Sequence, residues 1–317
     1  MKVFYYLVGR LILLLATLLA VSIAISAIMS LLPGDAAEQI LGAWSERSGA
    51  TLAALRTRLG IDQPWYVQYA DWLQMAVRGD LGNSLALSVP ITPILFDRLA
   101  NTLLLAIPAA LISIPLSLGL GVWGAVRKGR PIDHGISAVT LVGVSVPAFV
   151  LGPILIVVFS GYLQWFPSSS GLIQGSGATH LFLILALPVL TLTTESLAYI
   201  GRMVRASMIE TLKSPYVRMA RLKGLPERQV VLNHALRNSL LPTVTVIAFN
   251  IGWLIGGVVV VEQVFNYPGI GSLLLFAIEQ RDLPLIQATV FVTAAAYCTA
   301  NLLADIAYMA LNPRLRN

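Results

Sequence analysis

Six long apolar runs alternate with shorter polar segments along the chain. The first extends from Leu11 to Leu32, and five more lie at about 101–126, 135–160, 180–200, 239–261 and 286–311. Each is close to or above the roughly 20 residues that an α-helix needs to cross the hydrocarbon core of a bilayer. A helix also satisfies its own backbone hydrogen bonds in lipid. The pattern therefore predicts an all-α integral membrane protein with about six transmembrane helices.

The first apolar run also has features of a signal peptide, because Lys2 and Arg10 precede it and small residues lie near Ala24 and Ala27. Its 22 residues exceed the roughly 7–15 of a secretory hydrophobic region, so we expect a retained span. The chain then divides into an N-terminal transmembrane helix at 1–32, an outer insertion at 33–97 and a transmembrane core at 98–317.

The insertion at 33–97 is the longest polar segment. It opens with the helix breaker Pro33-Gly34-Asp35, after which Leu52, Leu55 and Leu59 follow helical spacing. A second helical set is aromatic and consists of Trp65, Tyr66, Tyr69 and Trp72. We expect amphipathic helices on the outer surface with aromatic rings at the level of the lipid headgroups. The same surface is equally suited to binding a partner protein.

Composition supports a membrane protein, and charge orients it. The chain is 57% hydrophobic and 11% charged, with mean hydropathy +0.80. Of its 21 Lys and Arg residues, 15 fall in alternate inter-span segments and the remaining 6 on the other side. The positive-inside rule makes the richer side cytoplasmic, so both termini are expected there. The net charge of +6 thus reflects topology and lipid contact and not nucleic-acid binding.

Enzyme and metal signatures are missing from the sequence. It has no G-x-x-x-x-G-K-[ST] phosphate loop and no H-E-x-x-H pair. The three histidines, His134, His180 and His234, are far apart, and Cys298 is the single cysteine. We therefore expect no catalytic residue, no metal site and no cofactor on this chain.

Two acidic residues lie inside apolar runs, Glu195 and Asp305. Carboxylates are costly in a bilayer and usually face a cavity or a partner, which makes both candidates for a translocation path. A structural role in helix–helix contact or at the interface is the other interpretation. If these carboxylates coupled transport to an ion, the protein would be a self-sufficient secondary carrier.

A basic, helix-patterned segment at 216–242 separates two apolar runs. Gly224 permits a tight turn, and Pro226 suits the first turn of a following helix. Before the turn, Val217, Ala220 and Gly224 share a narrow face of small side chains, a shape suited to entering a cleft. We expect two short cytoplasmic helices that dock onto another protein.

This segment resembles the cytoplasmic EAA loop of ABC importer permeases. Arg218-Met219-Ala220, Gly224 and Leu241-Pro242 occupy the motif positions, although the Glu and first Ala are missing. The peptide/nickel branch typically reads Y-V-R-T-A-R-A-K-G-L, and Tyr216 to Leu225 departs from it at Met219 and Leu222. Further stretches resemble the same branch across the chain: LGIDQP at 59–64, GDLGNS at 79–84, RMVRASM at 202–208, VEQVFNYPGIGS at 261–272 and NPRLR at 312–316, where Asn312 replaces an expected Asp.

The resemblance implies a B-type permease subunit of a dipeptide, oligopeptide or nickel importer in the bacterial inner membrane. A coupling loop at 201–238 would contact the ATPase through Tyr216, Val217, Arg218, Met219, Ala220, Arg221, Leu222, Lys223 and Gly224. The implied partners are a second homologous permease, two ABC ATPase subunits that bind ATP and Mg, and an extracytoplasmic solute-binding protein. Peptide, nickel and metal–chelator substrates all remain open. An ion-coupled carrier and a membrane-embedded enzyme are the hypotheses from other classes.

Overall fold

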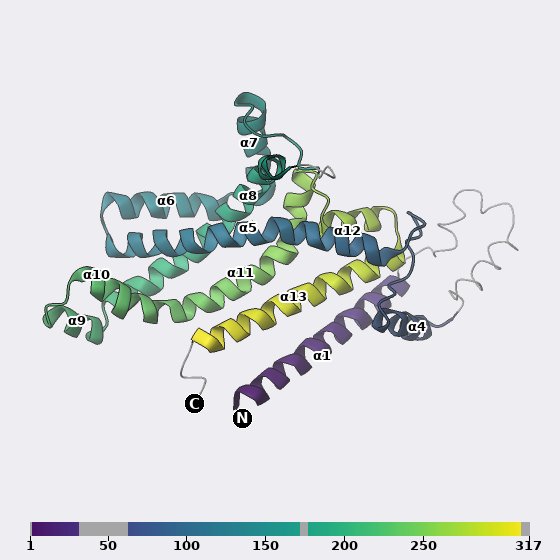
Figure 1. The fold of residues 1–317 in the computed structure, drawn as a ribbon, viewed down its shortest axis with the longest axis horizontal. Helices are drawn as coiled ribbons and strands as arrows, with labels where there is room; N and C mark the ends of the chain where they lie inside the picture. Colours follow the sequence, from purple (N-terminus) through teal and green to yellow (C-terminus); the bar gives the residue numbers. More distant parts are fainter. Residues whose placement is uncertain (1, 32–62, 172–176, 312–317) are drawn as a thin grey trace, which may run out of the picture. The chain divides into compact units, whose positions relative to one another are not determined.

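A computed structural model describes residues 2–31, 63–171 and 177–311 (Figure 1). Within these ranges the chain is helical and has no strand beyond an isolated bridge between Asn83 and Pro90, which confirms the predicted all-α class. The helices are α1 (Lys2–Leu31), α4 (Trp65–Val77), α5 (Ile91–Val126), α6 (Pro131–Ser145), α7 (Ala148–Leu155), the π-helix η2 (Ile156–Tyr162), α8 (Ala178–Leu212), α9 (Pro215–Leu222), α10 (Glu227–Gln229), the π-helix η3 (Val230–Leu236), α11 (Arg237–Val264), α12 (Ile270–Glu279) and α13 (Leu283–Leu311).

Four of these helices are long and apolar enough to cross a membrane. They contain the stretches Val8–Ser30, Ile91–Val126, Ala178–Leu212 and Leu283–Leu303. The bent pair formed by α6 and α7–η2 would make a fifth span. The multi-pass class is therefore confirmed, but the expected number of six spans is not. The run expected at 239–261 lies in α11, where the apolar stretch Pro242–Gly252 is shorter than the other spans.

The run expected at 135–160 is not a straight helix. The chain turns by 105° between α6 and α7–η2. Val146 has an extended backbone, with φ −98° and ψ 109°, because the ring of Pro147 disfavours a helical conformation in the residue before it. At Gly152 of α7 an added Cβ would lie 2.8 Å from Cγ1 of Val264, so a glycine is needed for α7 to approach the end of α11.

The described helices form two compact units, and α1, α5 and α13 contribute to both. Unit 1 is composed of residues 1–4, 103–267 and 300–317. Its core joins α5, α8 and α11 through buried side chains that include Leu105, Leu192 and Val258. Helix α8 also packs against α6 (Figure 1), and Gly143 brings the two close, since its added Cβ would lie 3.0 Å from the Cβ of Ala198.

Unit 2 is composed of residues 5–102 and 268–299. Trp72 of α4 is buried there, with its ring stacked near Tyr69 and edge-on to Phe291 of α13. The helix expected from the aromatic residues is therefore present, but the prediction that these rings lie at the lipid headgroups is wrong for Trp72, whose ring fills a protein core. The leucine set at 52–59 and the motif at 312–316 lie outside the described residues.

Asp282 links two distant segments of unit 2. It is fully buried, and its Oδ2 accepts hydrogen bonds from the Ser84 hydroxyl at 2.5 Å and the Ala86 amide at 3.1 Å. Its Oδ1 accepts from the Leu285 amide at 3.2 Å, in the first turn of α13. A buried carboxylate needs such donors. Asp282 thereby holds the segment after α4 against the start of α13, and we name this arrangement the Ser84–Asp282 clasp.

Candidate functional site

The basic segment forms a sharp corner between α9 and α10. Pro215 occupies the first turn of α9, where its missing N–H leaves no hydrogen bond unmade. After Leu222 the backbone closes in a Schellman motif: the Gly224 amide donates to the Arg221 carbonyl at 2.9 Å, and the Leu225 amide donates to the Ala220 carbonyl at 3.4 Å. Gly224 has φ +76°, a conformation that favours glycine. The predicted turn between two helices at Gly224 is thus confirmed, but the second helix is not a separate short one, because α10, η3 and α11 follow one another without a break from Glu227 to Val264.

One face of α9 is buried against its own chain. Val217 and Ala220 pack with Met208 of α8 and with Val230 and Ala235 of η3. The expectation that the small side chains of Val217 and Ala220 enter a cleft on a partner is therefore wrong. Their size instead allows α9 to lie close to the end of α8 and to η3.

The opposite face of α9 presents apolar side chains to the outside. Tyr216, Met219 and Leu222 are exposed at a spacing of three residues, and Leu222 reaches 74%. Arg218 and Lys223 are exposed beside them. Met and aromatic side chains ringed by Arg and Lys are typical of surfaces that bury themselves in a partner. We name Tyr216, Met219 and Leu222 the outer face of α9.

An ion pair braces the corner. Arg221 donates to Glu227 through Nη2 at 2.6 Å and through Nε at 3.1 Å. The hydrogen bonds from Arg221 lower the pKa of Glu227 below its usual value, and in return they raise the pKa of Arg221. Both groups are solvent-exposed, so the pair mainly orients α9 relative to α10 and adds little stability.

The corner is joined to the two long helices beneath it. The Ser207 hydroxyl of α8 donates to the Ser239 carbonyl of α11 at 2.9 Å. The Ser239 hydroxyl lies 3.4 Å from Sδ of Met208 and 2.9 Å from the Leu236 carbonyl. These contacts join α8 to α11, and the buried face of α9 packs on α8 and on η3, which continues into α11. A force on the outer face of α9 therefore reaches two long helices together.

A buried ion pair fastens the α5–α6 turn to α8. Asp133 of α6 is 2% exposed and accepts two hydrogen bonds from Arg205, from Nε at 2.6 Å and from Nη2 at 2.9 Å. The Gly129 amide donates to the same carboxylate at 2.9 Å. Asp133 and Arg205 are 72 positions apart in the sequence, so no local signal predicts this pair.

We expect Asp133→Leu to lower stability by about 2–4 kcal/mol, because it leaves the Arg205 guanidinium, which is 29% exposed, without its partner. The double variant Asp133→Leu/Arg205→Met removes the unpaired charge and should recover most of this loss. Thermal unfolding in detergent, followed by size-exclusion chromatography, measures both. Simple addition of the two single losses would contradict a coupled pair.

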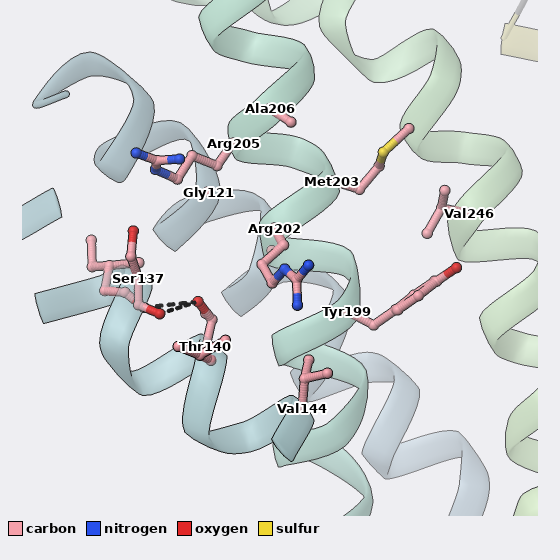
Figure 2. Close-up of a pocket in the computed structure, with 13 residues that line it drawn as sticks. Gly121, Ser137, Thr140, Val144, Tyr199, Arg202, Met203, Arg205, Ala206 and Val246 are labelled. Carbon is pink, nitrogen blue, oxygen red and sulfur yellow. Dashed lines mark hydrogen bonds between the residues drawn. The ribbon is translucent and has the colours of Figure 1, made fainter. Parts of the chain in front are cut away.

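A groove of about 780 Å³ opens beside α8 (Figure 2). Tyr199, Arg202, Met203 and Ala206 of α8 form its floor, α6 lines one side, and Val246 of α11 lies on the other. Figure 2 shows Arg202 between Thr140 and Tyr199. Sequence reasoning missed this groove, although the spacing of Glu195, Tyr199 and Arg202, at i, i+4 and i+7, already places them on one helix face.

The two candidate carboxylates lie on different helices of unit 1. Glu195 is in α8, and its Oε2 is buried without a hydrogen-bond partner among the described residues. Asp305 is in α13, half-buried, and makes an interaction of its own. The structure does not join them in one site.

The fold is that of a helical, multi-pass membrane protein with an exposed corner between α9 and α10. Two family models match the chain: residues 114–317 match "Binding-protein-dependent transport system inner membrane component", and residues 3–106 match the N-terminal region of this membrane component. The chain belongs to this family and is a permease subunit of an ABC importer.

Relatives match over nearly the whole chain. A protein of Brucella suis biovar 1 (strain 1330), named as a peptide permease, is 39% identical over 314 residues, 98% of each chain. The glutathione transport system permease protein of Escherichia coli (strain K12) is 37% identical over 311 residues, again 98% of each.

Solved structures share the fold. The MetNI methionine ABC transporter in inward-facing conformations has a TM-score of 0.56 at 17% identity and covers 69% of this chain and 96% of the matched one. An amino acid ABC transporter with histidines has a TM-score of 0.50 at 18% identity, covering 70% and 94%. At this identity the likeness concerns the fold alone.

Proposed function

We propose that this chain forms half of the translocation path of an ATP-driven importer for di- or oligopeptides. The observation that carries the substrate class is the 39% identity, over 98% of both chains, to a relative named as a peptide permease. The glutathione permease at 37% identity supports the same class, because glutathione is a tripeptide. Recognition of the peptide would begin on a separate solute-binding protein, which delivers it to the permease.

The proposed contact with a cytosolic ATPase subunit is the exposed part of Tyr216 to Gly224, within a coupling loop at 201–238; the buried Val217 and Ala220 do not take part in it. Support comes from the exposed apolar outer face of α9, which lies on a corner joined to both α8 and α11. ATP and Mg bind to two partner ATPases, whose closure would move this corner and reorient the spans. A second, homologous permease completes the path. In this proposal the chain forms half of the passage and changes conformation, while the partner subunits hydrolyse ATP.

The proposed orientation places the α9–α10 corner and both termini in the cytoplasm of a bacterial cell, with the chain in the inner membrane. The excess of Lys and Arg in the segments on that side supports it. The proposed divisions remain 1–32, 33–97 and 98–317, with the insertion at 33–97 facing the solute-binding protein on the outer side.

Glu195 and Asp305 are the proposed acidic members of the translocation path. In an ATP-driven importer neither carboxylate carries a coupling ion. Glu195→Gln should leave the fold intact and is expected to keep peptide uptake within about twofold of wild type. Uptake into right-side-out vesicles loaded with ATP measures this. Loss of uptake in a normally assembled Glu195→Gln complex would favour an ion-coupled carrier.

The function is tested by purifying the tagged chain from its host in mild detergent and identifying what remains bound by mass spectrometry. A second permease and ATPase subunits are expected. The complex is then placed in proteoliposomes with its solute-binding protein, and ATP-dependent uptake of labelled tripeptides is measured. A stable homo-oligomer without an ATPase, or a complex that accumulates no peptide, would overturn the proposal.

A further inference from the structure

The groove beside α8 has the charge and lining of a binding site for an anion. Arg202 is exposed in it and makes no hydrogen bond or ion pair within the described ranges 2–31, 63–171 and 177–311. The neighbouring Arg205 is engaged by Asp133. None of the residues that line the groove is acidic. The Arg202 guanidinium is therefore free to bind a carboxylate through two parallel hydrogen bonds.

The same face of α8 is polar at greater depth. Glu195 lies seven residues before Arg202, about 10 Å along the helix axis, and Tyr199 lies between them. Oε2 of Glu195 is buried without a hydrogen-bond partner among the described residues, and a carboxyl group in such a position is typical of a helix that borders a transport path and not lipid. A phospholipid headgroup held at Arg202 would direct its tails along the face that carries Glu195. A water-soluble ligand fits this face better.

The remaining lining suits the side chains of a peptide. Leu141 and Val144 of α6, Met203 of α8 and Val246 of α11 offer apolar surface on both sides of Arg202. Figure 2 shows the Tyr199 ring reaching toward Val246, so the lining also includes aromatic surface. The volume of about 780 Å³ falls within the roughly 300–1,000 Å³ of small-molecule sites.

From these observations we infer that Arg202 binds the C-terminal carboxylate of the transported peptide on its way through the permease. This inference rests on the proposed peptide function. It adds a selective contact at the cytoplasmic end of α8 to the selection made earlier by the solute-binding protein: Arg202 holds a free carboxylate there, while an amidated peptide has no negative charge for it to bind.

The test uses the complete transporter in proteoliposomes of phosphatidylethanolamine and phosphatidylglycerol, with ATP inside. Uptake is compared for a labelled tripeptide and its C-terminal amide, both first shown by calorimetry to load the solute-binding protein. In Arg202→Gln, uptake of the free acid is expected to fall about tenfold, toward the level of the amide. Amide uptake should change by less than about twofold, which also shows that the variant complex assembles.

Two further variants separate recognition from general charge. Arg202→Lys keeps the positive charge but lacks the planar guanidinium that binds a carboxylate through two hydrogen bonds. Its uptake of the free acid should lie between that of Arg202→Gln and that of wild type. Arg127→Gln removes an exposed cation from the α5–α6 turn, outside the groove, and should leave the ratio of acid to amide uptake unchanged. An unchanged ratio in Arg202→Gln, when wild type does import the tripeptide, would overturn the inference alone.

Two other results would also overturn it. If wild type imports no tripeptide, the proposed function fails and the inference fails with it. If Arg202→Gln lowers uptake of acid and amide equally, and vesicles without phosphatidylglycerol reproduce that loss in wild type, then Arg202 binds a lipid phosphate instead.

Discussion

Replacing Gly224 with valine is expected to lower ATP-driven uptake more than about tenfold while the chain remains inserted in the membrane. At φ +76° a residue with a Cβ is strained by about 1–2 kcal/mol, and a β-branched side chain by more. No heavy atom lies within 4 Å of the added Cβ, so the effect comes from the backbone and not from a clash. Relief of this strain opens the Schellman motif and misaligns α9, which a reconstituted uptake assay measures.

Gly79→Val provides a matched control. Gly79 has φ +84°, equally open surroundings and the same pair of hydrogen bonds, from the Gly79 amide to Ala76 and from the Asp80 amide to Met75. It ends α4 in unit 2, far along the chain from the corner. The two variants should lose similar stability, but Gly79→Val should retain ATPase coupling. Normal uptake by Gly224→Val would argue strongly against a coupling role for the corner.

The second large effect is expected from Leu222→Glu on the outer face of α9. Leu222 contributes the most exposed apolar side chain of this face, so the substitution should not disturb the chain itself. In the complex it would bury a carboxylate against an apolar surface of the ATPase. Loss of a central interface contact of this kind costs about 2 kcal/mol or more, which weakens association at least about 30-fold. Co-purification of the ATPase with the tagged permease measures the loss.

Val77→Glu is the corresponding control, because Val77 is 82% exposed at the end of α4. It introduces the same charge at an aliphatic position outside the corner, and the ATPase should co-purify as with wild type. If both variants retain the ATPase equally, the outer face of α9 is not the docking surface.

Much of the fold could be predicted from local sequence signals. Runs of apolar residues located the helices, and Gly224 with Pro226 located the corner, because a positive φ and a helix start depend on neighbouring residues. The faces of α9 were harder to assign. Small side chains at Val217 and Ala220 suit either a partner cleft or close packing within the chain, and only the tertiary structure shows the second.

Features that depend on distant residues could not be predicted. The Arg205–Asp133 pair joins α6 to α8, and the groove around Arg202 is lined by α6, α8 and α11. No spacing in the sequence predicts that these helices pack together. The π-helix at Val230–Leu236 departs from 3.6 residues per turn, so a regular helical pattern does not give the face that it buries, which consists of Val230, Val231 and Ala235. The bend before Pro147 had a local signal in the proline, but a proline is also tolerated within membrane helices.

The Ser84–Asp282 clasp has a consequence for biosynthesis. Its two side chains are 198 residues apart, so the segment that carries Ser84 emerges from the ribosome long before its acceptor exists. At about 5–20 residues per second, the delay is roughly 10–40 seconds. During that interval the segment after α4 is accessible to proteases and insertion factors. Final closure of unit 2 is therefore a post-insertion event, timed by arrival of the last long helix.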